Sequence, residues 1–389
     1  MKFGLLLLLC LFLAFTGLAQ ESILNIGTPK SVNYFEELPY ETINGKMFIY
    51  VELAGQKHKF LFDTGAPVAI SKELANELEL SIIDRIYVQD VNNRGDSSNV
   101  FSIDEIKLGN VAFNDIPAID IFPEIYKCWG IDGVIGSNIL RYSIVRINPD
   151  KHTITITDQT EKLTLNEANS TAMLTDNNDQ STPFIQVRLK NKLTLNLPFD
   201  TGDNGFLRLS EDLMTEIADS NVYKTIDSGY GASTEGAEGL QPNAEKYLLK
   251  FPLLSVAMAR FTNVFTETNK NGIPGIGARL LDYGTVTMDF INGKFYFDAK
   301  AESNDMDEKR WPFEPVFKDE KLIVGLVWKE ANKEVKPGQQ IISIDNKDCT
   351  KISICDLLNN GPVLAGKEQA TLVIKNKKGE EKKIRITKQ

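Results

Sequence analysis

The residues of this chain best suited to chemistry are two aspartates, each followed by Thr-Gly. The segment Phe62–Gly65 (Phe-Asp-Thr-Gly) has a second copy at Phe199–Gly202, and an apolar run precedes both copies. Two carboxyl groups within hydrogen-bond range cannot both ionise easily, so such a pair holds one proton as a unit. One member can take a proton from water while the other donates one to a substrate carbonyl oxygen. The pattern predicts amide hydrolysis by Asp63 and Asp200 without histidine, metal or cofactor.

The surroundings of the two aspartates are repeated as well. Gly133–Tyr142 follows the first aspartate and Pro274–Tyr283 follows the second, in the same order and at nearly the same spacing. We therefore expect an internal duplication with a pseudo-twofold arrangement that brings the carboxylates together. Gly65 and Gly202 permit close backbone approach, so that amide N–H groups can point at the carboxylates.

The segments that must position these residues are predicted to be mostly antiparallel β-strands. Lys46–Leu53 alternates apolar and polar residues as a half-buried strand does, and Lys59–Phe62 returns beside it as a more apolar strand. A second hairpin is expected before Asp200. A short helix is predicted to begin at Ser71 after the first aspartate, and another at Ser210 after the second.

The start of the chain has the pattern of an export signal. Lys2 precedes an apolar run from Leu5 to Phe15, and small residues end at Ala19. A transmembrane anchor is the alternative, but the run is shorter than the ~20 residues that a bilayer requires. We expect an exported (periplasmic or extracellular) protein, cleaved near Ala19, with no stable membrane insertion after signal removal.

Charge and composition exclude several other functions. The formal net charge of −10 gives no electrostatic support for a nucleic-acid partner. Only two histidines are present, His58 and His152, which nearly excludes a histidine-based triad or a multi-histidine metal site. After signal removal three cysteines remain, and at most Cys349 and Cys355 are expected to pair. Cys128 is expected to be a buried small apolar side chain.

From about residue 40 to 298 the chain resembles aspartic proteases of the pepsin/retropepsin type, in particular the bacterial two-repeat relatives of retropepsins. The matching parts are Asp63–Ala66, Asp200–Gly202 and Val134–Gly136. The resemblance implies a mainly β, bilobal acid protease fold with two duplicated β-barrel-like lobes. It also implies that Asp63 and Asp200 are catalytic and bind the attacking water.

The same resemblance implies supporting roles around the catalytic pair. Thr64 and Thr201 would hydrogen-bond across the lobe junction, beside Gly65 and Gly202. A β-hairpin flap usually closes over the substrate, and here residues 87–102 and 228–239 occupy the corresponding positions. Asp203 departs from the family pattern, which has Ser, Thr or Ala at this place. It is a candidate modulator that would raise the pKa of the shared proton by like-charge repulsion.

The C-terminal segment resembles a PDZ domain, a small α+β fold. The resemblance rests on Lys336–Asn346, and it implies that Leu322–Val327 accepts a peptide by β-augmentation. A charged, apolar-poor stretch before this segment is expected to be a linker. The expected division is a signal peptide (1–19), first lobe (20–160), second lobe (161–298), linker (299–311) and PDZ-like domain (312–389).

The predicted function is therefore an exported aspartic endopeptidase that acts on peptides or unfolded proteins, with the C-terminal domain assisting recognition of substrate or of a C-terminal peptide. The alternative is a catalytically inactive, protease-like peptide-binding protein. Two blander interpretations stay open for the aspartates: structural turns, or a calcium loop in the second copy. The calcium loop rests on EF-hand spacing of acidic and amide residues after the second aspartate (Asp200, Asn204, Gly205, Glu211).

Overall fold

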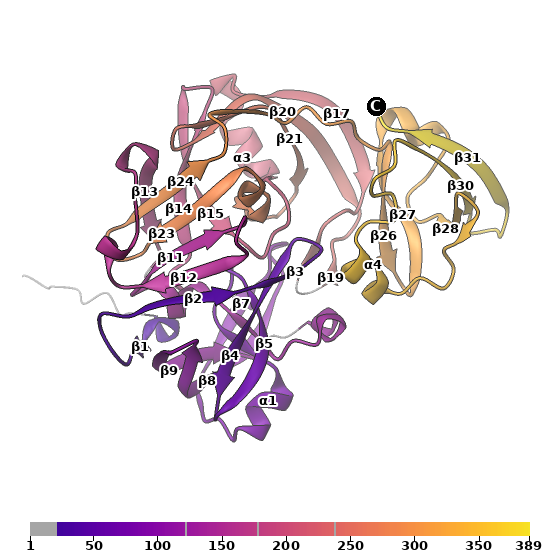
Figure 1. Cartoon of the computed structure of the whole chain (residues 1–389). Helices are drawn as coiled ribbons and strands as arrows, with labels where there is room; N and C mark the ends of the chain where they lie inside the picture. Colours follow the sequence, from indigo (N-terminus) through magenta and orange to yellow (C-terminus); the bar gives the residue numbers. More distant parts are fainter. Residues whose placement is uncertain (1–21, 121–122, 177–178, 237–238) are drawn as a thin grey trace, which may run out of the picture.

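The computed structural model describes residues 22–120, 123–176, 179–236 and 239–389, and its fold is mainly β (Figure 1). The predicted signal peptide, residues 1–19, lies outside these ranges. Two β-rich halves are stacked in the main body, and a smaller C-terminal unit, coloured yellow, lies beside the second half. Within the described ranges, no helix is long and apolar enough to cross a membrane.

The first half is built on a sheet, and one strand of this sheet ends directly before Asp63. Strands β4 (Lys46–Leu53) and β5 (Gln56–Phe62) form an antiparallel hairpin. Strand β10 (Gly133–Ile135) pairs parallel to β5 and antiparallel to β6 (Ala69–Ile70). In turn, β6 pairs parallel to β9 (Val111–Ile119). The apolar residues of β5 are buried between these neighbours, as the sequence predicts for a deep strand.

The second half repeats this pairing order, and one of its strands ends at Asp200. Strand β15 (Leu193–Asp200) pairs parallel to β22 (Gly275–Gly277). Strand β22 is antiparallel to β16 (Leu207–Ser210), which is parallel to β21 (Ala259–Asn269). Each half therefore shows the same series of parallel, antiparallel and parallel neighbours.

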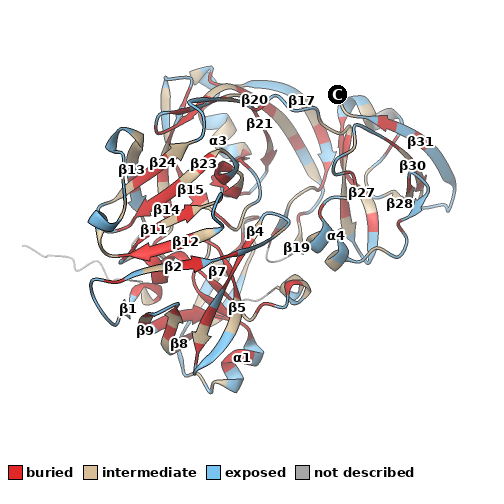
Figure 2. Ribbon diagram, in the orientation of Figure 1, coloured by how far each residue is buried: buried red, intermediate tan, exposed pale blue. Residues whose placement is uncertain are grey.

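A sheet made from both halves joins them. Its order is β2 (Phe35–Pro39), β12 (Thr153–Thr157), β11 (Ile144–Asn148), β23 (Gly284–Asp289) and β24 (Lys294–Ala299), all antiparallel. One large hydrophobic core runs through both halves and beneath this sheet. Figure 2 shows the buried residues of these strands in red. The two halves are thus packed as a continuous body.

Hairpins and short helices complete the halves. Helices α1 (Lys72–Glu77) and α3 (Glu211–Glu216) begin after Ser71 and Ser210, whose hydroxyls accept hydrogen bonds from backbone N–H groups in the first turn. The remaining elements of the main body are β1 (Thr28–Pro29), β3 (Glu41–Ile43), β7 (Ile82–Gln89), β8 (Gly95–Leu108), α2 (Ser137–Leu140), β13 (Ser170–Thr175), β14 (Pro183–Leu189), β17 (Lys224–Gly231), β18 (Glu235–Gly236), β19 (Gly239–Leu240) and β20 (Ala244–Val256).

The C-terminal unit has its own hydrophobic core, which includes Val324, Ile341 and Leu372. Its elements are β26 (Phe313–Lys318), β27 (Lys321–Trp328), β28 (Gln340–Ile344), β29 (Lys347–Asp348), α4 (Ile354–Asn360), β30 (Gln369–Lys375) and β31 (Glu381–Thr387).

The predicted linker, residues 299–311, differs in the structure. Residues Ser303–Asp305 form β25, which pairs parallel to β21 of the second half. Met306 is buried in the main core. The polar composition of the segment suggested a free connection, but its backbone hydrogen bonds and one apolar side chain attach it to the main body.

Strand β27 also differs from the open peptide acceptor predicted at Leu322–Val327. It pairs with β26 along its length and with β28 at Ile323. At Val327 and Trp328 it pairs with β17, a strand of the second half. The chain itself therefore occupies positions at which a peptide would have been added.

The predicted cysteine pairing is wrong. Cys128 and Cys355 form a disulfide, and Cys349 is a buried free thiol. Cys128 lies in the 3₁₀ segment η2 (Glu124–Trp129), against which α4 packs, so the two sulfurs meet although they are 227 residues apart in sequence. The disulfide therefore links the first half to the C-terminal unit.

Candidate active site

The two Asp-Thr-Gly turns lie side by side and exchange hydrogen bonds. The backbone N–H of Thr64 donates to Oγ1 of Thr201 at 3.0 Å, and the N–H of Thr201 donates to Oγ1 of Thr64 at 3.1 Å. Each hydroxyl in turn donates to a backbone carbonyl of the opposite strand, that of Phe199 at 2.6 Å and that of Phe62 at 3.0 Å. Both threonines are fully buried, so these four bonds join the two turns rigidly.

The glycines bring the two carboxylates face to face. The N–H of Gly65 donates to Oδ1 of Asp63, and the N–H of Gly202 donates to Oδ1 of Asp200, both at 2.9 Å. A Cβ on Gly65 would lie 2.4 Å from Cγ of Asp200, and one on Gly202 would lie 2.2 Å from Oδ2 of Asp63. Any side chain at either position would therefore displace the opposite carboxylate.

The pair holds a proton well above the pH at which an ordinary carboxyl group loses it. Burial, the largest cause, and the neighbouring carboxylate of Asp200 together raise the pKa of Asp63 from 3.8 to about 7, although Lys46 and the N–H of Gly65 act to lower it. Only 9% of Asp63 is exposed. The proton of the pair is therefore retained on the side of Asp63.

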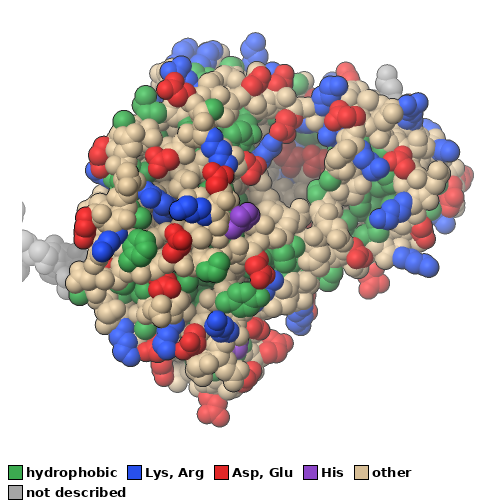
Figure 3. Space-filling model, viewed as in Figure 1, with side chains coloured by type: hydrophobic (Ala, Val, Ile, Leu, Met, Phe, Trp, Pro, Cys, Tyr) green, Lys and Arg blue, Asp and Glu red, His purple; other side chains and the backbone are tan. Residues whose placement is uncertain are grey.

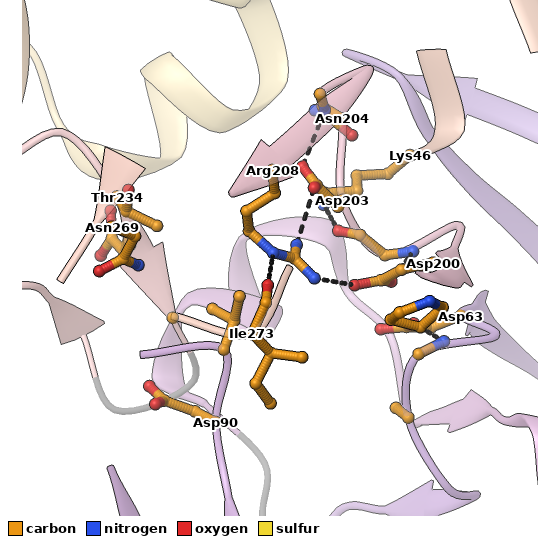
Figure 4. Close-up of a pocket in the computed structure, with 18 of the residues that line it drawn as sticks. Lys46, Asp63, Asp90, Asp200, Asp203, Asn204, Arg208, Thr234, Asn269 and Ile273 are labelled. Carbon is orange, nitrogen blue, oxygen red and sulfur yellow. Dashed lines mark hydrogen bonds and ion pairs between the residues drawn. The ribbon is translucent and has the colours of Figure 1, made fainter. Parts of the chain in front are cut away.

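A cation that the sequence reasoning missed lies on the second aspartate (Figure 4). Arg208, on β16, places Nη2 3.2 Å from Oδ2 of Asp200 and Nη1 2.7 Å from Oδ2 of Asp203. Asp203 was predicted to act on the pair by like-charge repulsion. Because Arg208 neutralises it at close range, that repulsion is largely offset, and Asp203 instead holds the guanidinium in place.

Lys46 and Tyr126 also line the site without having been predicted. The Lys46 ammonium, on β4, donates to the backbone carbonyl of Gly202. Burial raises the pKa of Tyr126, and the charges of Asp63 and Asp200 raise it further, so its hydroxyl keeps its proton at neutral pH. Neither residue has a fixed spacing from the Asp-Thr-Gly motif, so no pattern in the sequence indicated them.

The β7–β8 hairpin, predicted as a flap, covers one side of the cleft. Its flank, residues 86–91, lines a cleft of about 1080 Å³ that contains both aspartates. At the tip, the carbonyl of Val91 accepts from the N–H of Ile273 at 3.2 Å, and Oδ1 of Asn92 accepts from Nδ2 of Asn269 at 2.9 Å. The tip of a first-half hairpin therefore rests on the second half.

The other flap candidate, residues 228–239, has a different position. Residues 229 and 230 belong to β17 and pair with β27 of the C-terminal unit. Residues 237 and 238 lie outside the described ranges, and 233–236 line the cleft. The described part of this segment therefore contacts the C-terminal unit at residues 229 and 230 and lines the cleft at residues 233–236.

The cleft extends to the C-terminal unit. Glu314, Trp328 and Leu358 of that unit line it, and Figure 3 shows a hollow between the unit and the main body. Burial, the largest cause, and the carboxylate of Glu267 together raise the pKa of Glu314 to about 8. The Lys246 ammonium, which is fully buried and 3.1 Å from Oε1 of Glu267, acts to lower it. A second acidic pair thus lies in the cleft at the join between the two parts.

The calcium interpretation has no support in the geometry. Among the described residues, no group of three or more His, Cys, Asp or Glu side chains is arranged to hold a metal ion. Asp200 faces Asp63, and Nδ2 of Asn204 donates to the carbonyl of Asn44 at 2.8 Å, while Glu211 starts α3.

Comparison with known proteins bears on the first turn directly. Residues 49–139 match the family model described as aspartyl protease. This stretch contains Asp63, the β7–β8 hairpin, Tyr126 and the Val134–Gly136 motif, and it supports an aspartyl protease relationship for the first half. The match does not extend to Asp200. No curated protein matches the chain.

Two solved structures are similar to parts of the chain. The crystal structure of basic 7S globulin from soybean is 11% identical, with a TM-score of 0.38, and the similarity covers 70% of this chain and 96% of that one. A retropepsin-like aspartic protease from Rickettsia conorii is 20% identical, with a TM-score of 0.24, covering 32% of this chain and 92% of that one.

Proposed function

We propose that this protein is an exported aspartic endopeptidase that hydrolyses peptide bonds with a water activated by Asp63 and Asp200. The observation that carries the proposal is the pair of facing carboxylates, each held by its own glycine N–H and joined through reciprocal threonine hydrogen bonds. The aspartyl protease match over residues 49–139 supports the same chemistry for the first turn.

The proposed reaction uses the asymmetry of the pair. Asp200, as carboxylate, takes a proton from the attacking water, while Asp63 donates its proton to the substrate carbonyl oxygen. The water oxygen forms a bond to the carbonyl carbon and gives a tetrahedral diol. The C–N bond then breaks as a proton passes to the leaving nitrogen, one carboxyl remains protonated, and no covalent enzyme intermediate forms.

The same proposal includes a duplicated two-lobe fold and a PDZ-like C-terminal domain. The matching pairing order of the strands that end at Asp63 and Asp200 supports a duplicated, bilobal acid protease fold. The strand and helix order of residues 312–389 supports a PDZ-like domain. Since β27 is paired with β17, we propose that this domain contributes a wall of the cleft and contacts substrate there, instead of adding a peptide to β27.

The proposed location is outside the cytoplasm. The disulfide between Cys128 and Cys355 supports export, because such bonds persist in oxidising compartments. Peptides and unfolded proteins are the proposed substrates, since an open cleft lined by backbone and apolar groups accepts extended chains.

A catalytically inactive peptide-binding protein is the second candidate, and one observation favours it. Arg208 already forms an ion pair with Asp200, the carboxylate that must accept a proton from water. If this ion pair persists when a peptide binds, the protein would retain peptides without cutting them.

The test is digestion of a peptide library by the mature chain between pH 4 and 8, with Asp63→Asn and Asp200→Asn variants. Each substitution is expected to lower kcat/KM by about 100- to 10,000-fold, because each removes one acid–base partner. Circular dichroism checks that the variants are folded. Asp219→Asn, at an exposed site of the second half outside the cleft, is the matched control and should keep full activity.

Three outcomes would contradict the proposal. Substantial cleavage by either folded variant would remove the pair from the mechanism, and loss of activity in EDTA would indicate a metal. Peptide binding by the wild-type chain without any cleavage across this pH range would favour the binding protein.

A further inference from the structure

Arg208 connects three parts of the cleft with one side chain. Its Nη2 lies 3.2 Å from Oδ2 of Asp200, its Nη1 lies 2.7 Å from Oδ2 of Asp203, and its Nε donates to the carbonyl of Ile273 at 2.5 Å. The side chain is 14% exposed, and Figure 4 shows the guanidinium between these three groups. A planar guanidinium with several donors suits such simultaneous contacts.

The third contact ties Arg208 to the hairpin tip. Ile273 accepts from Arg208 through its carbonyl and donates through its N–H to the carbonyl of Val91. Close by, Asn92 and Asn269 hydrogen-bond between the tip and the second half. The residue whose carbonyl orients Arg208 is therefore held through its N–H by the flap-like hairpin.

We propose that Arg208 is a positioning residue that fixes the negative charge of the acidic pair on Asp200. This inference rests on the proposed function, because the reaction requires one ionised and one protonated carboxyl. Among the described residues the ion pair reaches Asp200 but not Asp63, so the two carboxyls differ although their glycine and threonine contacts match.

The charges around Asp200 favour this assignment. A cation at contact distance favours the ionised form of a carboxyl group and lowers its pKa by about 1–3 units. Asp203 offsets part of the charge of Arg208, but it contacts Nη1, whereas Nη2 is the nitrogen that faces Asp200. Lys46 lowers the pKa of Asp63, and both carboxyls of the pair act on Tyr126. The other charged and titratable side chains that line the same cleft are Asp203, Arg208, Tyr87, Asp90, Asp179, Glu235, Glu267, Arg279, Glu308, Arg310 and Glu314.

The first measurement is the pH dependence of kcat/KM for Arg208→Gln. Removing the cation makes ionisation of the pair harder, so the acidic limb should move to higher pH by about 1–3 units, and the basic limb should move in the same direction. Arg208→Lys keeps the charge and should recover part of the displacement. Arg188→Gln, which removes an arginine that donates to the Ala257 carbonyl of the second half outside the cleft, should move neither limb.

Asp203→Thr should shift the pH dependence of kcat/KM in the opposite direction from Arg208→Gln. Without Asp203, the guanidinium interacts with Asp200 alone, so both limbs should move to lower pH. A purely structural role for Arg208 would lower the rate without moving either limb. Unshifted limbs in Arg208→Gln would therefore overturn the inference.

A second measurement does not depend on cleavage. The ¹³Cγ shifts of the two aspartates in the labelled full chain, assigned through the Asp63→Asn and Asp200→Asn variants, give the order in which they lose protons. Asp200 should ionise at lower pH than Asp63 in the wild-type chain, and the difference should shrink in Arg208→Gln. An unchanged difference overturns the inference. If the two aspartates ionise in the expected order but the chain hydrolyses no peptide, the proposed function is overturned and the role of Arg208 stands.

Discussion

At the scale of single residues, the burial of Asp63 serves the proposed chemistry at a cost in stability. Its pKa is raised to about 7, so the folded protein retains a proton that the unfolded chain would lose near pH 4. Between pH 4 and pH 7, ionisation of Asp63 therefore favours the unfolded state. The free energy of unfolding is therefore expected to fall as the pH rises from 4 to 7, and to lose nothing more to this residue above that range.

Asp63→Asn is expected to remove this pH dependence. An amide cannot ionise, so at pH 8 the variant should be more stable than the wild-type chain by a few kcal/mol, while near pH 4 the two should be similar. Urea unfolding at several pH values measures the difference. A wild-type advantage that persists at pH 8 would mean that the carboxyl of Asp63 is stabilising in its ionised form.

At the scale of elements, the β7–β8 hairpin is held closed by a small polar contact. Asn92 and Asn269 are buried, and the bond between them joins the hairpin tip to the second half. Because residues 86–91 of this hairpin line the cleft, we expect that displacing this contact widens the entrance for a polypeptide.

Asn92→Ala should make that opening easier. Loss of one hydrogen bond of about 0.5–1.5 kcal/mol corresponds to a roughly 2- to 10-fold faster association of a fluorescent peptide, measured by stopped flow. Ser97→Ala, on an exposed part of the same hairpin, is the control and should leave the rate unchanged. Slower association in Asn92→Ala would show that the tip contact preorganises the cleft instead of closing it.

At the scale of the whole molecule, the C-terminal unit is bound to both halves. The disulfide attaches α4 to η2, and β27 pairs with β17. Together with β25, these contacts determine what we expect of a chain that ends after residue 298. Such a truncation removes a strand neighbour of β21 and uncovers apolar residues beside Met306, so it should destabilise the main body instead of leaving it intact.

The disulfide itself can be tested without truncation. Cys128→Ser together with Cys355→Ser is expected to lower the free energy of unfolding by about 2–5 kcal/mol, because the bridge closes a long loop. It should also lower kcat/KM, since η2 carries Tyr126 beside the aspartates. Thermal unfolding with and without reductant measures the first effect. Cys349→Ala should keep the reductant sensitivity of the wild-type chain, whereas the double variant should lack it.

The sequence was most informative where residues repeat. The Asp-Thr-Gly copies and the glycine motifs downstream indicated both turns, and the alternating strands indicated a mainly β fold. The serine caps placed α1 and α3 because capping is a local interaction.

The features that the sequence did not disclose depend on contacts between distant segments. Arg208 and Lys46 reach the aspartates from strands on which a cation has no diagnostic spacing. Cys128 meets Cys355 only because α4 packs on η2, and β17 meets β27 across the join of two units. An exposed strand edge pairs through backbone N–H and C=O groups, which nearly every residue supplies, so residue types alone did not indicate the partner.

The bridge between Cys128 and Cys355 closes a covalent ring that contains Asp200 but not Asp63. A single backbone cut inside this ring, for example in the polar segment before β14, separates the two aspartates in sequence without releasing a fragment. A molecule cut in this way becomes a two-chain form that is heavier than the intact chain only by the one water added in hydrolysis. It would migrate as one band in non-reducing electrophoresis and as two bands after reduction, with both aspartates still held in one covalent unit until the disulfide is broken.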